Sequence, residues 1–299
     1  MSTVGLIGLG AMGAGMAGSL WRAGHQVRVY DVRPEAAQAF AAQGGVACTS
    51  LAELGAACQV VISVVVNAEQ TEQVLWGEPG SDSGVAHAMK PGSTFVMCST
   101  VAPQRSIEWE QALQAMGLHY LDAPISGGAA RAASGEMTMM TAGSAQAYAQ
   151  TQTYLDAMAG KVYKLGDRAG NGSKVKIINQ LLAGVHIAAA AEAMALGLRA
   201  GVEANELYEV ITHSAGNSWM FENRMAHVLA GDYTPLSAVD IFVKDLGLVL
   251  DTARASKFPL PLASTAHQMF MQASSAGHGR EDDSAVIKIF PGIELPQKD

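Results

Sequence analysis

A lysine and two carboxamides lie within a long apolar segment in the second half of the chain. Lys176, Asn179 and Gln180 stand at positions i, i+3 and i+4 of the run GNGSKVKIINQ, so a helix would place them on one face. A lysine amine can accept a proton and its ammonium can donate one, which suits general acid–base catalysis. The alternative is a lysine whose stem covers apolar surface while its ammonium reaches water.

Two further segments have residues that suit an anionic substrate. The segment DAPISGG follows a predicted strand, and exposed backbone amides at Ser126, Gly127 and Gly128 can form a concave anion site. The alternative is a flexible loop. Lys244 and Asp245 interrupt an apolar run over residues 241–248. They suit a buried functional pair or, alternatively, an ion pair on a helix surface.

The beginning of the chain has the pattern of a dinucleotide-binding turn. A strand over residues 4–7 leads into a glycine-rich turn, a helix as far as Gly24, and a second strand over residues 26–30. The turn consists of Gly8, Leu9, Gly10, Ala11, Met12 and Gly13. Its glycines permit a tight turn, backbone approach to a pyrophosphate, and close packing of helix on strand. A tight turn without a ligand is the alternative, but the complete strand–turn–helix–strand context favours nucleotide binding.

Asp31 ends the second predicted strand, 18 residues after Gly13. A carboxylate at about this distance accepts hydrogen bonds from the adenosine ribose hydroxyls. It repels a 2′-phosphate, so the sequence favours NAD over NADP. Arg33, two residues later, could offset that repulsion; the alternative is a solvated loop arginine.

The composition predicts a soluble globular protein with a large core. The chain is 49% hydrophobic and 15% charged, and its net charge of −8 argues against nucleic acid as a partner. Cys48, Cys58 and Cys98 form no CxxC pattern, and the eight histidines form no HxH or HxxxH pair, so neither a disulfide framework nor a metal site is predicted.

We expect a cytoplasmic protein. The first predicted strand begins at about residue 3, which leaves no room for a signal peptide. The most apolar stretch, residues 177–198, includes Asn179, Gln180, His186 and Glu192. It is therefore predicted to be a buried helix rather than a membrane span.

Two domains are predicted from the change of pattern along the chain. Residues 1–165 alternate strand-like and helix-like segments, which is typical of an α/β Rossmann domain with a doubly wound, mostly parallel sheet. Residues 166–299 are predicted to be all-α and to bind substrate and form oligomers. They begin with a long helix over about 173–200 that joins the domains. Strands are expected at 60–66, 94–98, 119–121, 137–141 and 162–165, and helices at 34–43, 104–116, 145–158, 205–214, 218–230, 237–255 and 261–276.

Four motifs occur in the same order as in a known family. The sequence GLIGLGAMG, then DAPISGG, GNGSKVKIINQ and KDLGL, resembles the β-hydroxyacid dehydrogenases, which include 3-hydroxyisobutyrate dehydrogenase. The resemblance covers nearly the whole chain. It departs from the family at Val65, where a Leu-Pro pair is common, and at Gln180, where asparagine is common.

The resemblance implies a role for each motif. Lys176 would be the catalytic lysine, and Ser126, Gly127 and Gly128 would hold the substrate carboxylate with help from Asn179. Lys244 would lie near both nicotinamide and substrate, with Asp245 beside it. Val65 and Thr100 match cofactor-contacting positions. In oxidation, neutral Lys176 would take the hydroxyl proton as hydride leaves carbon for NAD; no metal is required.

The resemblance also bears on the substrate, a small anionic hydroxy acid. The residues from Gly127 to Thr138 and from Ala238 to Asp245 are most similar to the L-threonate branch of the family. Asn217, Ser218 and Asn223 could meet a polyhydroxy acid or simply cap helices. Tartronate semialdehyde reduction and 3-hydroxyisobutyrate oxidation are alternatives. A non-catalytic NAD-binding protein is an alternative of another class. The apolar helix over 174–200 predicts a homodimer or homotetramer.

Overall fold

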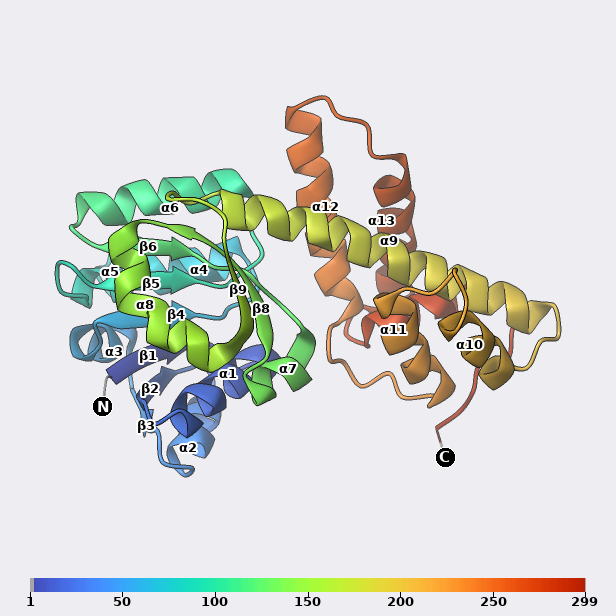
Figure 1. Cartoon of the computed structure of the whole chain (residues 1–299), viewed down its shortest axis with the longest axis horizontal. Helices are drawn as coiled ribbons and strands as arrows, with labels where there is room; N and C mark the ends of the chain where they lie inside the picture. The colour runs from blue at the N-terminus through green and yellow to red at the C-terminus, as the bar shows by residue number, and fades with distance from the viewer. Residues whose placement is uncertain (1–2, 299) are drawn as a thin grey trace. The chain divides into compact units, whose positions relative to one another are not determined.

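The computed structural model describes residues 3–298, and these form two compact units (Figure 1). The first unit ends at Lys176 and the second begins at Ile177. The sequence predicted a boundary at residues 165/166. The contacts divide the chain a little later, inside a helix, because the first turn of that helix is hydrogen-bonded to the first unit.

The first unit is an α/β domain with a largely parallel sheet. Its strands are β1 (Thr3–Ile7), β2 (Gln26–Tyr30), β3 (Val46–Ala47), β4 (Val60–Ser63), β5 (Thr94–Met97), β6 (His119–Asp122), β7 (Ile125–Ser126), β8 (Met137–Gly143) and β9 (Ala159–Lys164). They pair in the order β3-β2-β1-β4-β5-β6-β8-β7, with β9 also beside β8. The strands β1 to β6 are mutually parallel, whereas β8 is antiparallel to β6 and β7. The predicted doubly wound sheet is confirmed.

Helices cover both faces of this sheet. They are α1 (Ala11–Arg22), α2 (Pro34–Ala41), α3 (Leu51–Ala57), α4 (Ala68–Trp76), α5 (Val85–Ala88), α6 (Pro103–Ala115), α7 (Gly128–Ser134) and α8 (Ala145–Met158). One core cluster joins β-strand side chains such as Leu6 and Ile62 to α1, α2 and α8. A second joins Val61 and Phe95 to α3, α4, α5 and α6. Side chains alternate between the two faces along each strand, which is why adjacent residues Val61 and Ile62 enter different clusters.

Several helices begin where the sequence supplies a capping group. Ser50, Asn67 and Ser144 each accept a hydrogen bond from a backbone N–H in the first turn of α3, α4 and α8. Pro34 and Pro103 begin α2 and α6, where a missing N–H costs nothing. The strand predicted over 60–66 ends at Ser63, because residues 64–66 leave the sheet and line a pocket.

The second unit is helical, as predicted. The helix α9 (Asn171–Arg199) begins in the first unit and continues into the second. It is followed by α10 (Ala204–Thr212), α11 (Trp219–Leu229), α12 (Val239–Ala255), α13 (Pro261–Ala273), a π-helical turn (Ser274–His278) and a 3-10 segment (Asp283–Ile289). Phe242 of α12 stacks on Phe270 of α13 with ring centroids 5.1 Å apart. A side chain at Gly184 would come within 2.9 Å of Leu246, so α9 and α12 pack closely.

The helix α9 is long and apolar enough to cross a membrane by length and composition alone. In the second unit, however, Ile187, Ala191 and Met194 of α9 are buried in the core. It also carries polar residues, among them Asn179 and Gln180. These features agree with the prediction of a core helix in a globular protein.

Candidate active site

The glycine-rich turn joins β1 to α1 at the point where the strand order reverses. Gly8 has φ +91°, and a Cβ there would lie 2.7 Å from the carbonyl oxygen of Val64. A Cβ on Gly13 would lie 1.8 Å from the oxygen of Gly8, so only glycine lets the helix pack this closely. A Cβ on Gly10 would meet no atom within 4 Å. The turn therefore packs tightly on the protein side and is open on the side of Gly10, which suits close approach of a ligand.

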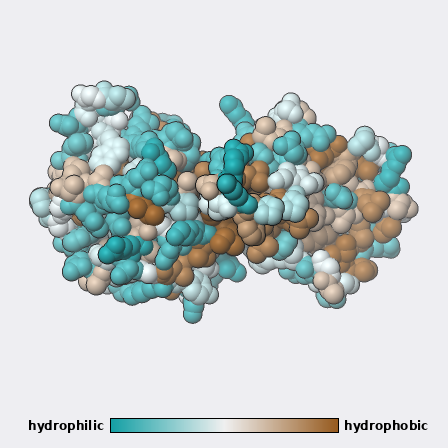
Figure 2. Space-filling model, turned by 90° about the horizontal axis from the view of Figure 1, so that it is seen from above, coloured by the Kyte–Doolittle hydropathy of each residue, from teal (hydrophilic) through white to brown (hydrophobic). Residues whose placement is uncertain are grey.

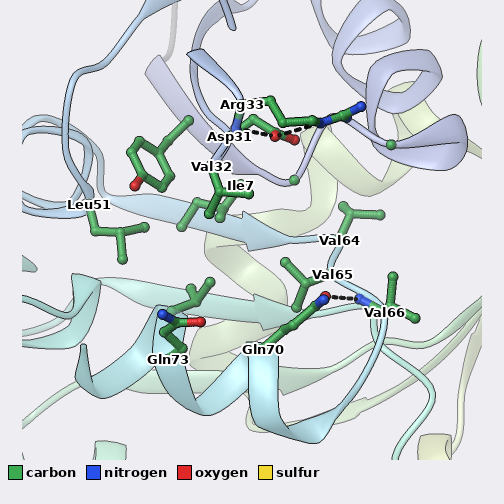
Figure 3. A pocket seen from close by; sticks show the side chains of 14 residues that line it. Ile7, Asp31, Val32, Arg33, Leu51, Val64, Val65, Val66, Gln70 and Gln73 are labelled. Atoms are coloured by element: carbon green, nitrogen blue, oxygen red, sulfur yellow. Dashed lines mark hydrogen bonds and ion pairs between the residues drawn. The ribbon is translucent and has the colours of Figure 1, made fainter. Parts of the chain in front are cut away.

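A cavity of about 370 Å³ opens beside this turn (Figure 3). Of the predicted cofactor residues, Gly8, Gly10, Asp31 and Val65 line it. Leu9, Ala11, Met12 and Gly13 belong to the adjoining turn and first helical residues. Figure 3 shows Asp31, Val32 and Arg33 on one side of the cavity, and Gln70 and Gln73 on the opposite side.

Asp31 is held by the turn that it adjoins. Its Oδ2 accepts from the backbone N–H of Leu9 at 2.6 Å, and its Oδ1 accepts from the backbone N–H of Arg33 at 2.9 Å. The Arg33 guanidinium also donates to Oδ1 at 3.3 Å. Burial raises the pKa of Asp31, but the hydrogen bonds from Arg33 and Leu9 outweigh it and leave the pKa below its ordinary value. The carboxylate is thus ionised and fixed at neutral pH.

The sequence did not indicate the opposite wall of the cavity. This wall of the cavity includes Gln70 and Gln73 of α4, together with Val64 and Val66. Gln70 accepts from the backbone N–H of Val66 at 2.9 Å, so it also shapes the loop after β4. Two glutamines three residues apart on a helix that follows a central strand could have been recognised, because ligands bind at the carboxyl ends of such strands.

The backbone of Val65 is held in place by two hydroxyl groups. Ser99 donates to the carbonyl oxygen of Val65 at 2.8 Å, and Thr71 lies 3.1 Å from the Ser99 hydroxyl. Thr100 is the next residue after Ser99 in the loop that follows β5, and it is half-buried. The departure from the family pattern at Val65 therefore falls on a loop with its own hydrogen-bonded support.

The segment containing Ser126, Gly127 and Gly128 is a strand-to-helix turn rather than an open loop. Ser126 pairs with Thr138 in β8, and α7 begins at Gly128. Gly127 and Gly128 have φ +135° and +76°, which favour glycine. The two glycines thus give the backbone a fixed turn directly after a paired strand.

Lys176 lies in the second turn of α9 and is only 7% exposed. This burial contradicts the alternative of a lysine that extends to the surface. Lys174, two residues earlier, is exposed. The two lysines of this motif therefore have different environments.

Two of the predicted motifs meet within the second unit. Gln180 donates to Asp245 Oδ2 at 2.6 Å, and Asn179 donates to the Gln180 side-chain oxygen at 3.1 Å. Lys244 forms an ion pair with Asp245 Oδ1. Asp245 is 1% exposed, so this pair is not the surface ion pair considered as an alternative.

The polar residues considered for substrate contact have structural hydrogen bonds. Ser218 caps α11 by accepting from the N–H of Phe221 at 3.0 Å, and Asn217 donates to the carbonyl oxygen of Thr212 at 3.0 Å. Asn223 accepts from Arg224. The capping interpretation therefore applies to Ser218, whereas the buried side-chain oxygen of Asn217 has no hydrogen-bond partner among the described residues. In the part of the chain from residue 3 to residue 298, we find no cluster of His, Cys, Asp and Glu suited to a metal.

Comparison with known proteins covers both units. Residues 3–166 match the NAD binding domain of 6-phosphogluconate dehydrogenase, and residues 170–290 match the family described as NAD-binding of NADP-dependent 3-hydroxyisobutyrate dehydrogenase. The chain is 68% identical to L-threonate dehydrogenase of Cupriavidus necator over 99% of this chain and 98% of that protein. It is 54% identical to L-threonate dehydrogenase of Escherichia coli K12 over 98% and 96% of the two chains.

A crystal structure named 3-hydroxyisobutyrate dehydrogenase, from Salmonella typhimurium, has the same fold. It is 56% identical to this chain, with a TM-score of 0.92, and the match covers 97% of this chain and 100% of that one. The names of these similar proteins therefore agree on the reaction class and differ on the hydroxy acid.

Proposed function

Because this chain belongs to the β-hydroxyacid dehydrogenase family and is an NAD-dependent oxidoreductase acting on a CH–OH group, we propose that it oxidises L-threonate at C2. The product would be the 2-oxo acid. One observation carries this choice of substrate: 68% identity, along almost the full length of both chains, to the L-threonate dehydrogenase of Cupriavidus necator.

The cofactor preference rests on the cavity beside β2. The open side of Gly10 and the fixed carboxylate of Asp31 suit a dinucleotide whose ribose carries free hydroxyls. The negative charge of Asp31 would repel the 2′-phosphate of NADP. NAD, when bound, supplies the hydride acceptor. We therefore expect a lower KM for NAD than for NADP.

Lys176 performs the proton transfer in this proposal. Its amine takes the proton of the C2 hydroxyl during oxidation, and its ammonium returns it during reduction. The turn at Ser126, Gly127 and Gly128 provides backbone N–H groups for the substrate carboxylate. By the resemblance, Asn179 and Lys244 bind substrate as well, with Lys244 near the nicotinamide, and Thr100 contacts the cofactor.

A substrate panel tests the choice of hydroxy acid. Purified enzyme is assayed with NAD and with NADP on L-threonate, D-threonate, L-erythronate, D-erythronate, 3-hydroxyisobutyrate and D-glycerate. We expect the highest kcat/KM for L-threonate with NAD. A higher kcat/KM for 3-hydroxyisobutyrate would overturn the substrate and retain the reaction class. Bound NADH without turnover on any acid would favour a non-catalytic NAD-binding protein.

The role of Lys176 is tested with a matched pair of variants. Lys176→Ala should lower kcat by about 10²–10⁴-fold, the usual contribution of general acid–base catalysis, while NADH still binds. Lys174→Ala removes a lysine from the same helix end at an exposed position, and we expect nearly unchanged kcat. Equal activity of the two variants would exclude Lys176 as the acid–base group.

We further propose a homo-oligomer in the cytoplasm. Ile178, Leu182 and Leu196 of α9 are 60%, 51% and 69% exposed and follow a helical period. Figure 2 shows apolar surface on the helical unit, where Trp219, Phe258 and Leu262 are also exposed. Light scattering after size exclusion should give a dimer or tetramer mass, and Leu182→Lys should lower it. A monomeric wild-type protein would contradict the proposal. Cell fractionation tests the location.

A further inference from the structure

We propose that Asp122 is a positioning residue for the acid–base lysine: its buried carboxylate fixes the first turn of α9 to the end of β6. The inference rests on the proposed role of Lys176. It adds a residue to which neither the motif resemblance nor the proposed mechanism assigns a role. All the groups that carry it belong to the first unit.

The side chain of Asp122 takes three hydrogen bonds from the start of α9. Oδ2 accepts from the backbone N–H of Gly170 at 2.8 Å and of Ser173 at 3.0 Å, and Oδ1 accepts from the Ser173 hydroxyl at 2.7 Å. The N–H groups at the start of a helix have no partner within the helix. Asp122 therefore acts as the cap of α9, although it lies 51 residues before Ser173.

The first turn of α9 packs closely against the sheet. A Cβ on Gly172 would lie 2.4 Å from the carbonyl oxygen of Met140 and 3.0 Å from that of Asp122. The start of α9 therefore has little room to move toward the sheet, and the hydrogen bonds to Asp122 keep it from moving away. Both restraints act on one turn of helix.

Lys176 lies three residues after Ser173 and four after Gly172, so it occupies the same side of the helix, one turn further on. A helix is stiff over one turn, and a displacement at Ser173 therefore reaches Lys176. A misplacement of about 1 Å at a reacting group can cost about a hundredfold in rate. This is the size of effect that loss of the Asp122 carboxylate is expected to produce.

The main chain of Asp122 also leads to the substrate-carboxylate turn. The next residue, Ala123, donates to Met97 at 2.8 Å, and Pro124 accepts from Met140 at 2.9 Å. Ser126 follows two residues later. The side chain of Asp122 thus fixes the proposed acid–base helix, and the two residues after it hold the chain that leads to the proposed carboxylate turn.

The chemistry of the side chain supports a carboxylate at this place. Asp122 is fully buried, and its surroundings include three donors from the start of α9. Burial raises the pKa of Asp122, whereas the hydrogen bonds from Ser173 and Gly170 lower it and leave a net rise. An asparagine would keep the volume but turn an NH₂ group toward one of these donors.

Three variants test the proposal on the intact enzyme. Asp122→Asn should lower kcat about a hundredfold, and Ser173→Ala, which removes one of the three bonds, should lower it several-fold. The NADH dissociation constant should stay within twofold of wild type, because Asp122 does not line the cofactor cavity. Thr141→Val is the control, since it deletes two part-buried hydrogen bonds of the first unit, to the Tyr148 hydroxyl and to the carbonyl oxygen of Tyr163.

The deuterium isotope effect on kcat, measured with C2-deuterated substrate, distinguishes positioning from a loss of folded protein. Misplacement of Lys176 slows the chemical step, so the isotope effect of Asp122→Asn should rise above that of wild type. A purely structural role would lower kcat only in proportion to the fraction of enzyme that binds NADH and leave the isotope effect unchanged. That second result, or the same kcat loss in Thr141→Val, would overturn the proposal.

The hydroxy acid for these assays is whichever member of the panel the wild-type enzyme oxidises fastest. An error in the choice of L-threonate would then appear in the wild-type data alone and leave the ratio for Asp122→Asn interpretable. If Lys176→Ala retained full activity, the proposed acid–base role would fail, and with it the positioning of that group by Asp122. If Lys176→Ala lost activity while Asp122→Asn retained wild-type kcat, only the positioning role would fail.

Discussion

Two pairs of buried acids, one pair in each unit, have partners of different kinds. In the first unit, Asp122 and Glu110 accept from backbone N–H groups near the start of α9. In the second unit, Asp283 pairs with the guanidinium of Arg224, and Asp282 pairs with His227. A backbone donor is neutral and remains after any substitution except one to proline, whereas a side-chain cation leaves an uncompensated charge when its partner is lost. The two units should therefore respond differently to substitution and to pH.

The largest effect is expected from breaking the buried pair of the second unit. Arg224→Met leaves the carboxylate of Asp283 buried without its cation and should lower the free energy of unfolding by about 3–5 kcal/mol. Urea denaturation followed by tryptophan fluorescence and by circular dichroism measures this, because Trp219 lies in the second unit and the other three tryptophans lie in the first.

Arg105 provides the control for that measurement. Its guanidinium pairs with Glu72 and Glu108 at the surface of the first unit and is 45% exposed. Arg105→Met should cost less than about 1 kcal/mol, as surface pairs do. Equal losses in the two variants would show that burial does not set the difference.

The next largest effect concerns the backbone packing of the first unit. Gly13→Ala places a methyl group against the carbonyl oxygen of Gly8 and should lower the free energy of unfolding by about 1–3 kcal/mol. The same substitution should weaken NADH binding. Gly10→Ala meets no protein atom, so its melting temperature should match wild type while NADH binding weakens. Thermal denaturation and NADH fluorescence titration check both. A stable Gly13→Ala would contradict the packing argument.

A pair of acid-to-amide substitutions sharpens the comparison. Glu110→Gln keeps an oxygen that can accept from Ala169, and it removes a buried carboxyl whose pKa is raised by burial. Its cost should be about 1 kcal/mol or less. Asp283→Asn should cost more, because Arg224 then loses its counter-charge. Urea midpoints compare the two; the reverse order would undermine the distinction between the units.

The smallest effect is the pH dependence that His227 gives to the second unit. The hydrogen bond to Asp282 raises the pKa of His227, and the negative charges of Asp282 and Asp283 raise it further. Burial and the positive charge of Arg224 lower this pKa, but the net shift is upward. The stabilisation by charged His227 is therefore complete below about pH 6.5 and is lost as pH rises through the higher folded-state pKa. His227→Asn should lose less unfolding free energy than wild type between pH 6 and pH 9. If the unfolding free energies of His227→Asn and wild type changed equally between pH 6 and pH 9, this prediction would be wrong.

The sequence predicted the parts of the fold that are encoded locally. The strand–turn–helix–strand pattern ending at Asp31 depends on neighbouring residues, and so do the long helix and the helical second unit. The short elements β3, β7, α3, α4, α5 and α7 were not predicted. Each has at most nine residues, so its apolar residues are too few to establish a period by themselves. The division of contacts at Lys176, inside α9, depends on tertiary packing and has no signal in the local sequence.

The sequence by itself determined which residues have the chemistry: the glycines of the turn, Asp31, the lysines, and the order of the four motifs. Only the tertiary structure decided which of them support one another. It brought Gln180 to Asp245, Gln70 to the wall opposite Asp31, and the carboxylate of Asp122 to the start of α9. Local spacing sets hydrogen bonds within a helix or a turn. The placement of residues far apart in the sequence depends instead on the order of the strands and the packing of whole helices, which local spacing does not specify.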